Sequence, residues 1–106
     1  FAMGARGTVE IARIQTIPYV MDARTASTFL ISANQGWNIH GIRGAGIPGQ
    51  IVTIMMVNRG TFHHAEAGVI TEERFNGISA RDILTIAPSA FQFIWVNREV
   101  GWYRLI

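Results

Sequence analysis

Alternation of apolar and polar residues over short runs is the feature that most constrains the fold of this chain. In residues 8–14 and 37–42, apolar residues recur at every second position, which is the periodicity of a β-strand. Turn-forming residues such as Asn34-Gln35-Gly36 and Asn58-Arg59-Gly60 separate such runs. The pattern predicts about eight short strands, at residues 8–14, 28–32, 37–42, 50–57, 61–66, 82–86, 91–96 and 102–106.

Many short strands with frequent turns are typical of an antiparallel β-sandwich or jelly roll, so we expect an all-β fold. Only residues 18–27 leave room for a helical turn. The 106 residues contain no cysteine and no run of eighteen apolar residues, so neither a disulfide nor a transmembrane helix is expected. We interpret residues 1–4 (FAMG) as a cloning remnant or cut point, and residues 5–106 as one domain.

The composition predicts self-association. Apolar residues make up 49% of the chain and charged residues only 15%, against a usual charged share of about 25%. A small domain has a large surface relative to its volume and should need more polar cover than a large one. We therefore expect copies of the chain to cover part of each other's surface.

Two of the predicted strands are apolar on both faces. In residues 50–57 (QIVTIMMV), Ile51 and Met55 share one face, and the opposite face is equally apolar. Residues 91–96 (FQFIWV) show the same property. One face of such a strand fits the core and the other a neighbouring subunit, although a long loop covering a central strand is an alternative. The residues that we expect at or near subunit contacts are Ile51, Met55, Trp95 and Tyr103.

Residues 44–49 (GAGIPG) have the spacing G-x-G-x-x-G of a dinucleotide-binding loop. That loop requires a helix directly after it, whose N-terminus holds the pyrophosphate. Here Pro48 and the β-branched run 50–57 follow, so we expect a connection between strands. No cofactor is predicted.

The sequence predicts neither a metal site nor an enzyme. His63 and His64 are neighbours and point to opposite faces of a strand, whereas His64 and Glu66 share a face and need a third ligand such as His40. We expect surface histidines here, with a pH-responsive interface as an alternative. The chain has no G-x-S-x-G motif, and the adjacent Glu72-Glu73 is not a catalytic pair, so no catalytic residue is predicted.

The charged residues argue against nucleic-acid binding. All nine basic residues are Arg, the net charge is only +2, and no basic run occurs. Residues 71–77 are the most polar stretch and are expected to form an exposed connection able to carry recognition. An exposed Trp37 is the candidate for stacking on a sugar.

The last eighty residues or so resemble the C-terminal head domains of bacteriophage tail fibres and tail-needle knobs. In that pattern Gly49-Gln50 precedes an apolar strand that closes on Asn58 and Gly60, and an apolar strand and a terminal Trp-Tyr segment follow at 93–96 and 102–106. The resemblance implies a jelly roll similar to tumour-necrosis-factor heads, assembled as a homotrimer at the end of a shaft in the virion. It also implies contact with a component of the bacterial cell surface and no catalytic residue.

Three further hypotheses remain open at this stage. The first is that the chain is a capsid decoration protein, which locks onto a shell. A small carbohydrate-binding module using Trp37 is the alternative of a different class. In a trimer, Arg side chains near the three-fold axis are expected to hold a small anion, because clustered guanidinium groups require counter-charge.

Overall fold

The computed structural model describes residues 8–44, 47–77, 83–84 and 89–105 of the 106. In this part of the chain the fold is all-β, and no helix in it is long and apolar enough to cross a membrane. The predicted remnant at residues 1–4 lies outside the described residues. The elements are β1 (Thr8–Ile11), β2 (Val20–Asp22), β3 (Thr28–Ile31), β4 (Trp37–Ile39), β5 (Gly41–Arg43), β6 (Ile51–Met56), β7 (Gly60–Phe62), the 3-10 helix η1 (Thr71–Glu73), β8 (Phe75–Gly77), β9 (Ile83–Leu84), β10 (Ser89–Asn97) and β11 (Gly101–Arg104).

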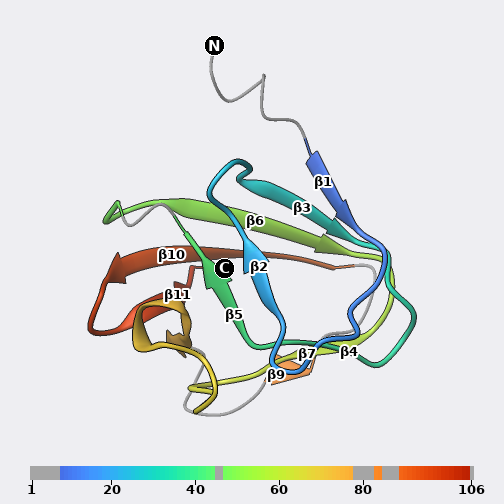
Figure 1. Cartoon of the computed structure of the whole chain (residues 1–106). Helices are drawn as coiled ribbons and strands as arrows, with labels where there is room; N and C mark the ends of the chain where they lie inside the picture. Colours follow the sequence, from blue (N-terminus) through green and yellow to red (C-terminus); the bar gives the residue numbers. More distant parts are fainter. Residues whose placement is uncertain (1–7, 45–46, 78–82, 85–88, 106) are drawn as a thin grey trace.

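The first seven strands wind around the core in a solenoid-like arrangement. β1, β3 and β6 lie side by side and parallel, so Thr8 stands beside Thr28 and Thr28 beside Thr53 (Figure 1). β2 pairs with β5 and β4 pairs with β7, also in parallel. Between two parallel partners the chain passes through strands of other sheets, for example through β2 between β1 and β3. These segments supply the long crossover that parallel pairing requires.

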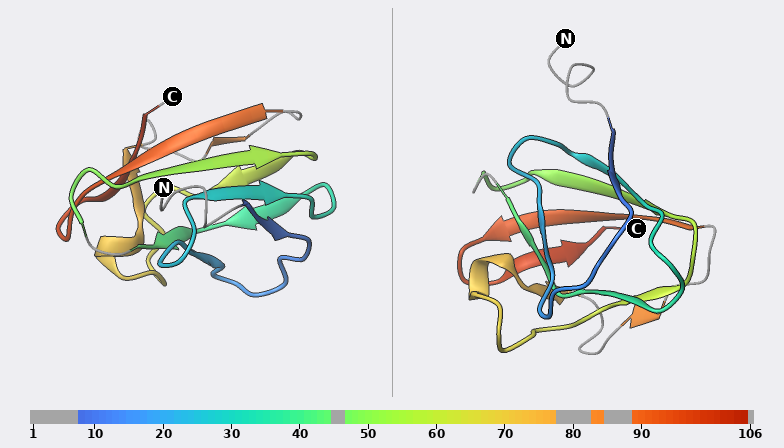
Figure 2. Two further views of the ribbon diagram at one scale, coloured as in Figure 1. Left: turned by 90° about the horizontal axis from the view of Figure 1, so that it is seen from above. Right: turned by 45° about the vertical axis from the view of Figure 1, so that its right-hand side comes forward.

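The last strands add an antiparallel extension to the same sheet. β10 pairs antiparallel with β6 and with β11, and β11 pairs parallel with β8. The result is a six-stranded sheet with the order β1-β3-β6-β10-β11-β8. Figure 2 (left) shows β1, β3, β6 and β10 in this order across the sheet. β2-β5 and β4-β7-β9 form two smaller sheets.

The prediction of an antiparallel sheet was wrong for most of the described pairings, because five of the eight are parallel. Period-two alternation reports which side chains share a face and contains no information about the direction of the partner strand. The predicted turns at 34–36 and 58–60 illustrate the difference. They do not close hairpins; the amide of Gly36 donates to the carbonyl of Arg59 at 2.8 Å, so one turn stacks on the other.

The alternation itself was predicted correctly. In β6, Val52, Ile54 and Met56 are buried, while Ile51 is exposed. The buried side continues across neighbouring strands, since Phe29 pairs with Ile54 in the register of β3 and β6. Each fully buried side chain of this size contributes about 1.5–3 kcal/mol, so such rows account for most of the stability of the core.

Trp95 and Trp102 join the antiparallel extension to the rest of the core. They are cross-strand partners of β10 and β11, and both are buried. The Nε1–H of Trp102 donates to the carbonyl of Ile42 at 2.8 Å, and that of Trp95 donates to the carbonyl of Glu72 at 2.9 Å. The two indoles therefore connect β5 and η1 to the six-stranded sheet.

Two segments differ from the prediction made for them. Residues 18–27 contain the strand β2 where a helical turn had been allowed. Residues 71–77 are not a plain exposed connection, because Phe75 is fully buried and β8 pairs with β11. Strands of three residues are too short to show a period-two pattern. Most of the strand predicted at 82–86 lies outside the described residues.

Candidate functional site

The side of the six-stranded sheet that faces away from the core carries two groups of apolar side chains, which the row of Thr28, Thr53 and Gln92 separates. Register places Leu30 beside Met55, and Ile94 beside both Ile51 and Tyr103. Ile51 is 42% exposed and Tyr103 is 39% exposed, while the other three are half-buried. We call this surface the outer sheet face; its apolar members are Leu30, Ile51, Met55, Ile94 and Tyr103.

The outer sheet face has little charge. Its remaining paired positions in β3, β6 and β10 are Thr28, Thr53, Ala90 and Gln92, and the amide of Gln92 donates to Thr53 Oγ1 at 3.2 Å. Glu10, at the edge strand β1, is the charged residue in these described rows. Exposed apolar surfaces with little charge are typical of interaction sites, which makes this face the candidate site of the described residues.

Three of the four residues predicted at subunit contacts belong to this surface. Ile51, Met55 and Tyr103 point outward, whereas Trp95 is 4% exposed and lies in the chain's own core. Ile94, which alternates with Trp95 along β10, occupies the outer position instead. The reason is that both faces of β10 are apolar, so composition alone does not distinguish the core face from the outer one.

The arginine near these strands does not point to the outer sheet face. Arg104 is the cross-strand partner of Phe93, which is a core residue, and its guanidinium carbon lies 4.5 Å from the centroid of the Phe91 ring. A cation over an aromatic face is a favourable contact in its own right. The described rows of the outer sheet face therefore supply no guanidinium group for the small anion predicted at a subunit interface.

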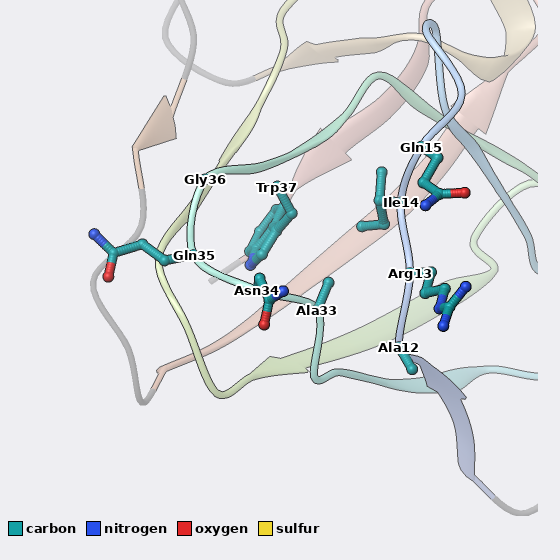
Figure 3. Close-up of a pocket in the computed structure, with 9 residues that line it drawn as sticks. All are labelled: Ala12, Arg13, Ile14, Gln15, Ala33, Asn34, Gln35, Gly36 and Trp37. Atoms are coloured by element: carbon teal, nitrogen blue, oxygen red, sulfur yellow. The ribbon is translucent and has the colours of Figure 1, made fainter.

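A cleft of about 490 Å³ lies between residues 12–15 and residues 33–37. Figure 3 shows Ile14 pointing across it toward Trp37, while Arg13 and Gln15 point away from Trp37. In a ligand site a few polar side chains converge on one point, and the polar side chains of this cleft do not. The cleft is thus an open slot between two segments of backbone.

Trp37 does not form an exposed platform for a sugar, so that expectation was wrong. The indole is 4% exposed, and its Nε1–H donates to the carbonyl of Asn58 at 2.8 Å. Asn58 in turn donates through Nδ2 to the carbonyl of Ala33 at 2.9 Å. Trp37 therefore fastens one turn of the winding to the next, a role that its position after a turn did not reveal.

The histidines come together differently from the prediction. His40, His63 and Glu66 form a cluster whose possible ligand atoms lie within 4.8 Å of one another, with His63 where His64 had been considered. β7 ends at Phe62 and Ala65 has a positive φ of 48°, so the face rule for strands does not apply to residues 63–66. Parallel pairing of β4 with β7 then brings His40 and His63 together.

The arrangement of this cluster does not fit a metal ion. The two imidazole rings are stacked, with centroids 4.4 Å apart and planes at 5° to each other, so their nitrogen lone pairs lie in two nearly parallel planes and do not converge on one point. Nδ1 of the buried His40 accepts the amide hydrogen of Tyr19 at 3.0 Å, which puts the proton of the neutral ring on Nε2. Nε2 of His63 lies 2.8 Å from Oδ1 of Asn38. The geometry favours a packing role for the pair.

The G-x-G-x-x-G stretch precedes a strand, as predicted. Gly49 has a positive φ of 90°, its amide donates to the carbonyl of Trp95 at 2.8 Å, and β6 begins two residues later. No helix N-terminus stands behind this loop to hold a phosphate. Ala45 and Gly46 lie outside the described residues.

A row of exposed charges crosses β2 and β5. Asp22 accepts from Arg24 through both carboxylate oxygens, at 2.7 Å and 3.0 Å. These hydrogen bonds, with that of the Arg24 amide, lower the pKa of Asp22 to about 2. Arg43 is the cross-strand neighbour of Asp22 and pairs with Glu73 at 3.2 Å.

Comparison of the chain with protein-family models, with curated proteins and with solved structures found no match.

Proposed function

We propose that this chain is the non-enzymatic head domain of a bacteriophage tail needle or tail fibre, which assembles as a homotrimer in the virion and contacts the host cell envelope. The observation that carries the proposal is the outer sheet face, on which exposed Ile51 and Tyr103 flank the half-buried Ile94, and the half-buried Met55 lies beside Leu30. An apolar sheet surface with little charge is a template for association in water. The resemblance described above supplies the viral context.

We infer further that the layers form a sandwich. The six-stranded sheet and the two smaller sheets contribute to one buried cluster, in which Phe29, Met21 and Ile39 represent the three sheets. The jelly-roll connectivity of the resembled heads is antiparallel, and the parallel winding of β1, β3 and β6 departs from it. The proposed relationship is therefore one of assembly and position in the virion, and not of strand order.

The outer sheet face is present on every chain, so three copies can direct it toward a common three-fold axis. Closed assemblies bury such faces around a symmetry axis. A stable interface buries on the order of 800 Å² per partner, which a six-stranded sheet can provide. Bulky side chains in the middle of the face, such as Ile94, would form its desolvated centre.

Sedimentation equilibrium at micromolar concentration tests the proposal. We expect a mass about three times the 11.7 kDa of one chain. A species of 11.7 kDa at every concentration would reject self-association and with it the trimeric head.

Capsid decoration is the second candidate, favoured by the same apolar surface. If the chain is a monomer by itself and pellets together with empty capsids, capsid decoration is supported over a role at the tail tip.

A further inference from the structure

A second cleft, of about 500 Å³, opens between the segment that leads into β2 and the segment around η1. Tyr19, Arg43, Val69 and Glu73 contribute to its lining, and we call it the Tyr19 cleft. Its volume falls within the range of about 300–1,000 Å³ that is usual for small-ligand sites. In contrast to the slot beside Trp37, it combines an aromatic ring, an apolar wall and a pair of opposite charges.

Hydrogen bonds hold both walls of the Tyr19 cleft in place. On one wall, Tyr19 exchanges two bonds with His40: its carbonyl accepts from the His40 amide at 2.8 Å, and its amide donates to the His40 ring at 3.0 Å. On the other wall, Nε of Arg74 donates to the carbonyl of Val69 at 2.7 Å, and the Glu73 amide donates to the carbonyl of Ile70 at 2.9 Å. The cleft is thus formed before any ligand arrives, which lowers the entropic cost of binding.

The apolar part of the cleft contains an aromatic side chain. Tyr19 is half-buried, and burial raises the pKa of its phenol, so the hydroxyl is neutral near pH 7 and able to donate a hydrogen bond. Val69 is 3% exposed and forms part of the wall. The Tyr19 side chain is partly exposed to water and packs against the core, and such an aromatic ring suits a ligand with one apolar face.

The polar part of the cleft is the pair of Arg43 and Glu73. Nε of Arg43 lies 3.2 Å from Oε2 of Glu73, and the Arg43 side chain is 50% exposed while that of Glu73 is 14% exposed. Because the pairing uses Nε, the two terminal amino groups of the guanidinium remain able to donate. A strong donor therefore stands beside a strong acceptor at the same edge of the cleft.

We propose that the Tyr19 cleft binds a neutral saccharide. Sugar hydroxyls both donate and accept, so two adjacent hydroxyls match the adjacent guanidinium and carboxylate, and the apolar face of the sugar ring lies on Tyr19. An anionic ligand fits less well, because the Glu73 carboxylate would repel it. The inference deepens the proposed function, since it names the class of cell-surface ligand, and it transfers the sugar contact from buried Trp37 to Tyr19.

Titration of the ¹⁵N-labelled chain with methyl glycosides of glucose, galactose, mannose and N-acetylglucosamine tests the proposal by NMR. We expect one of them to bind saturably with a dissociation constant of about 1 mM, with shifts confined to residues 16–20, 41–43 and 68–73. Arg43→Gln and Tyr19→Ala should each weaken binding at least roughly tenfold. Arg98→Gln, an exposed arginine outside the cleft, is the matched control and should bind as the wild type does.

Three outcomes would overturn the proposal: no saturation by any glycoside at about 50 mM, shifts outside the cleft, or unchanged binding by Arg43→Gln. Preference for glucuronic acid or for an acidic tetrapeptide over the neutral glycosides would also reject the neutral class. Arg43→Gln keeps the test decisive if Tyr19→Ala does not fold. Sedimentation of the same samples separates the trimeric head from the saccharide site. A monomer that binds sugar refutes only the trimer. A trimer that binds no sugar refutes only the saccharide site.

Discussion

Gly60 lies directly against the indole ring of Trp37, and a Cβ atom on Gly60 would overlap that ring. The two residues are register partners of β7 and β4, so a strand without a side chain at this point passes over the flat face of the tryptophan. Gly60→Ala should therefore force the indole or the strand to move and destabilise the fold by about 1–3 kcal/mol. Urea unfolding followed by circular dichroism measures the change.

Gly68→Ala is the matched control for this substitution. A Cβ on Gly68 would lie 3.4 Å from Cγ of Pro18, which is an ordinary contact. Its free energy of unfolding should stay within about 0.5–1 kcal/mol of the wild type. An equal loss in both variants would show that glycine flexibility, and not the space above Trp37, explains the effect.

Asp22 should titrate well below an ordinary aspartate. Hydrogen bonds from Arg24 lower its pKa to about 2 from the usual 3.8, so the folded state favours the charged form. The contribution to stability is then complete above about pH 4 and is lost as the pH falls toward about 2. It should be small, because exposed ion pairs contribute little. NMR titration of the carboxyl carbon measures the pKa directly, and Arg24→Ala should return it toward 3.8. If Arg98→Ala raises it equally, the hydrogen bonds from Arg24 are not the cause.

A negative charge on the outer sheet face should break the proposed assembly and leave the fold intact. Ile94→Asp places a carboxylate beside Ile51 and Tyr103, where association would bury it without a partner. We expect the dissociation constant of the oligomer to rise at least tenfold, or about 1.4 kcal/mol. Ile17→Asp changes an apolar residue that is 81% exposed and lies outside the sheet, and it should assemble normally. Equal masses for the two variants in sedimentation would exclude this face as the interface.

Trp102 should be among the residues most sensitive to substitution. Its side chain is fully buried, and its Nε1–H satisfies the carbonyl of Ile42. Trp102→Phe removes that donor and leaves a void, so we expect a loss of about 2–4 kcal/mol in the free energy of unfolding. Tyr103→Phe, on the outer side of the same strand, should change it by less than about 0.5 kcal/mol under monomeric conditions. A mild effect at Trp102 would mean that the core relaxes around the smaller ring.

The candidate sites were only partly predictable from the sequence. Ile51, Met55 and Tyr103 were predicted at or near subunit contacts, and they lie on the outer sheet face because side chains alternate between the two faces of a strand. Whether that surface meets another copy stays a prediction. No sequence pattern predicted the Tyr19 cleft, because Tyr19 and Glu73 are far apart along the chain and come together only in the tertiary structure.

Residue order alone determined that the chain is all-β, roughly where most of its strands lie, and which side chains of β6 share a face, because side chains alternate between the two faces of a strand. The tertiary structure decided everything that depends on neighbours. It set parallel winding in place of hairpins, buried Trp37 and Trp95, and put His63 beside His40. Alternation specifies a face, whereas the partner of that face is selected by packing over the whole core.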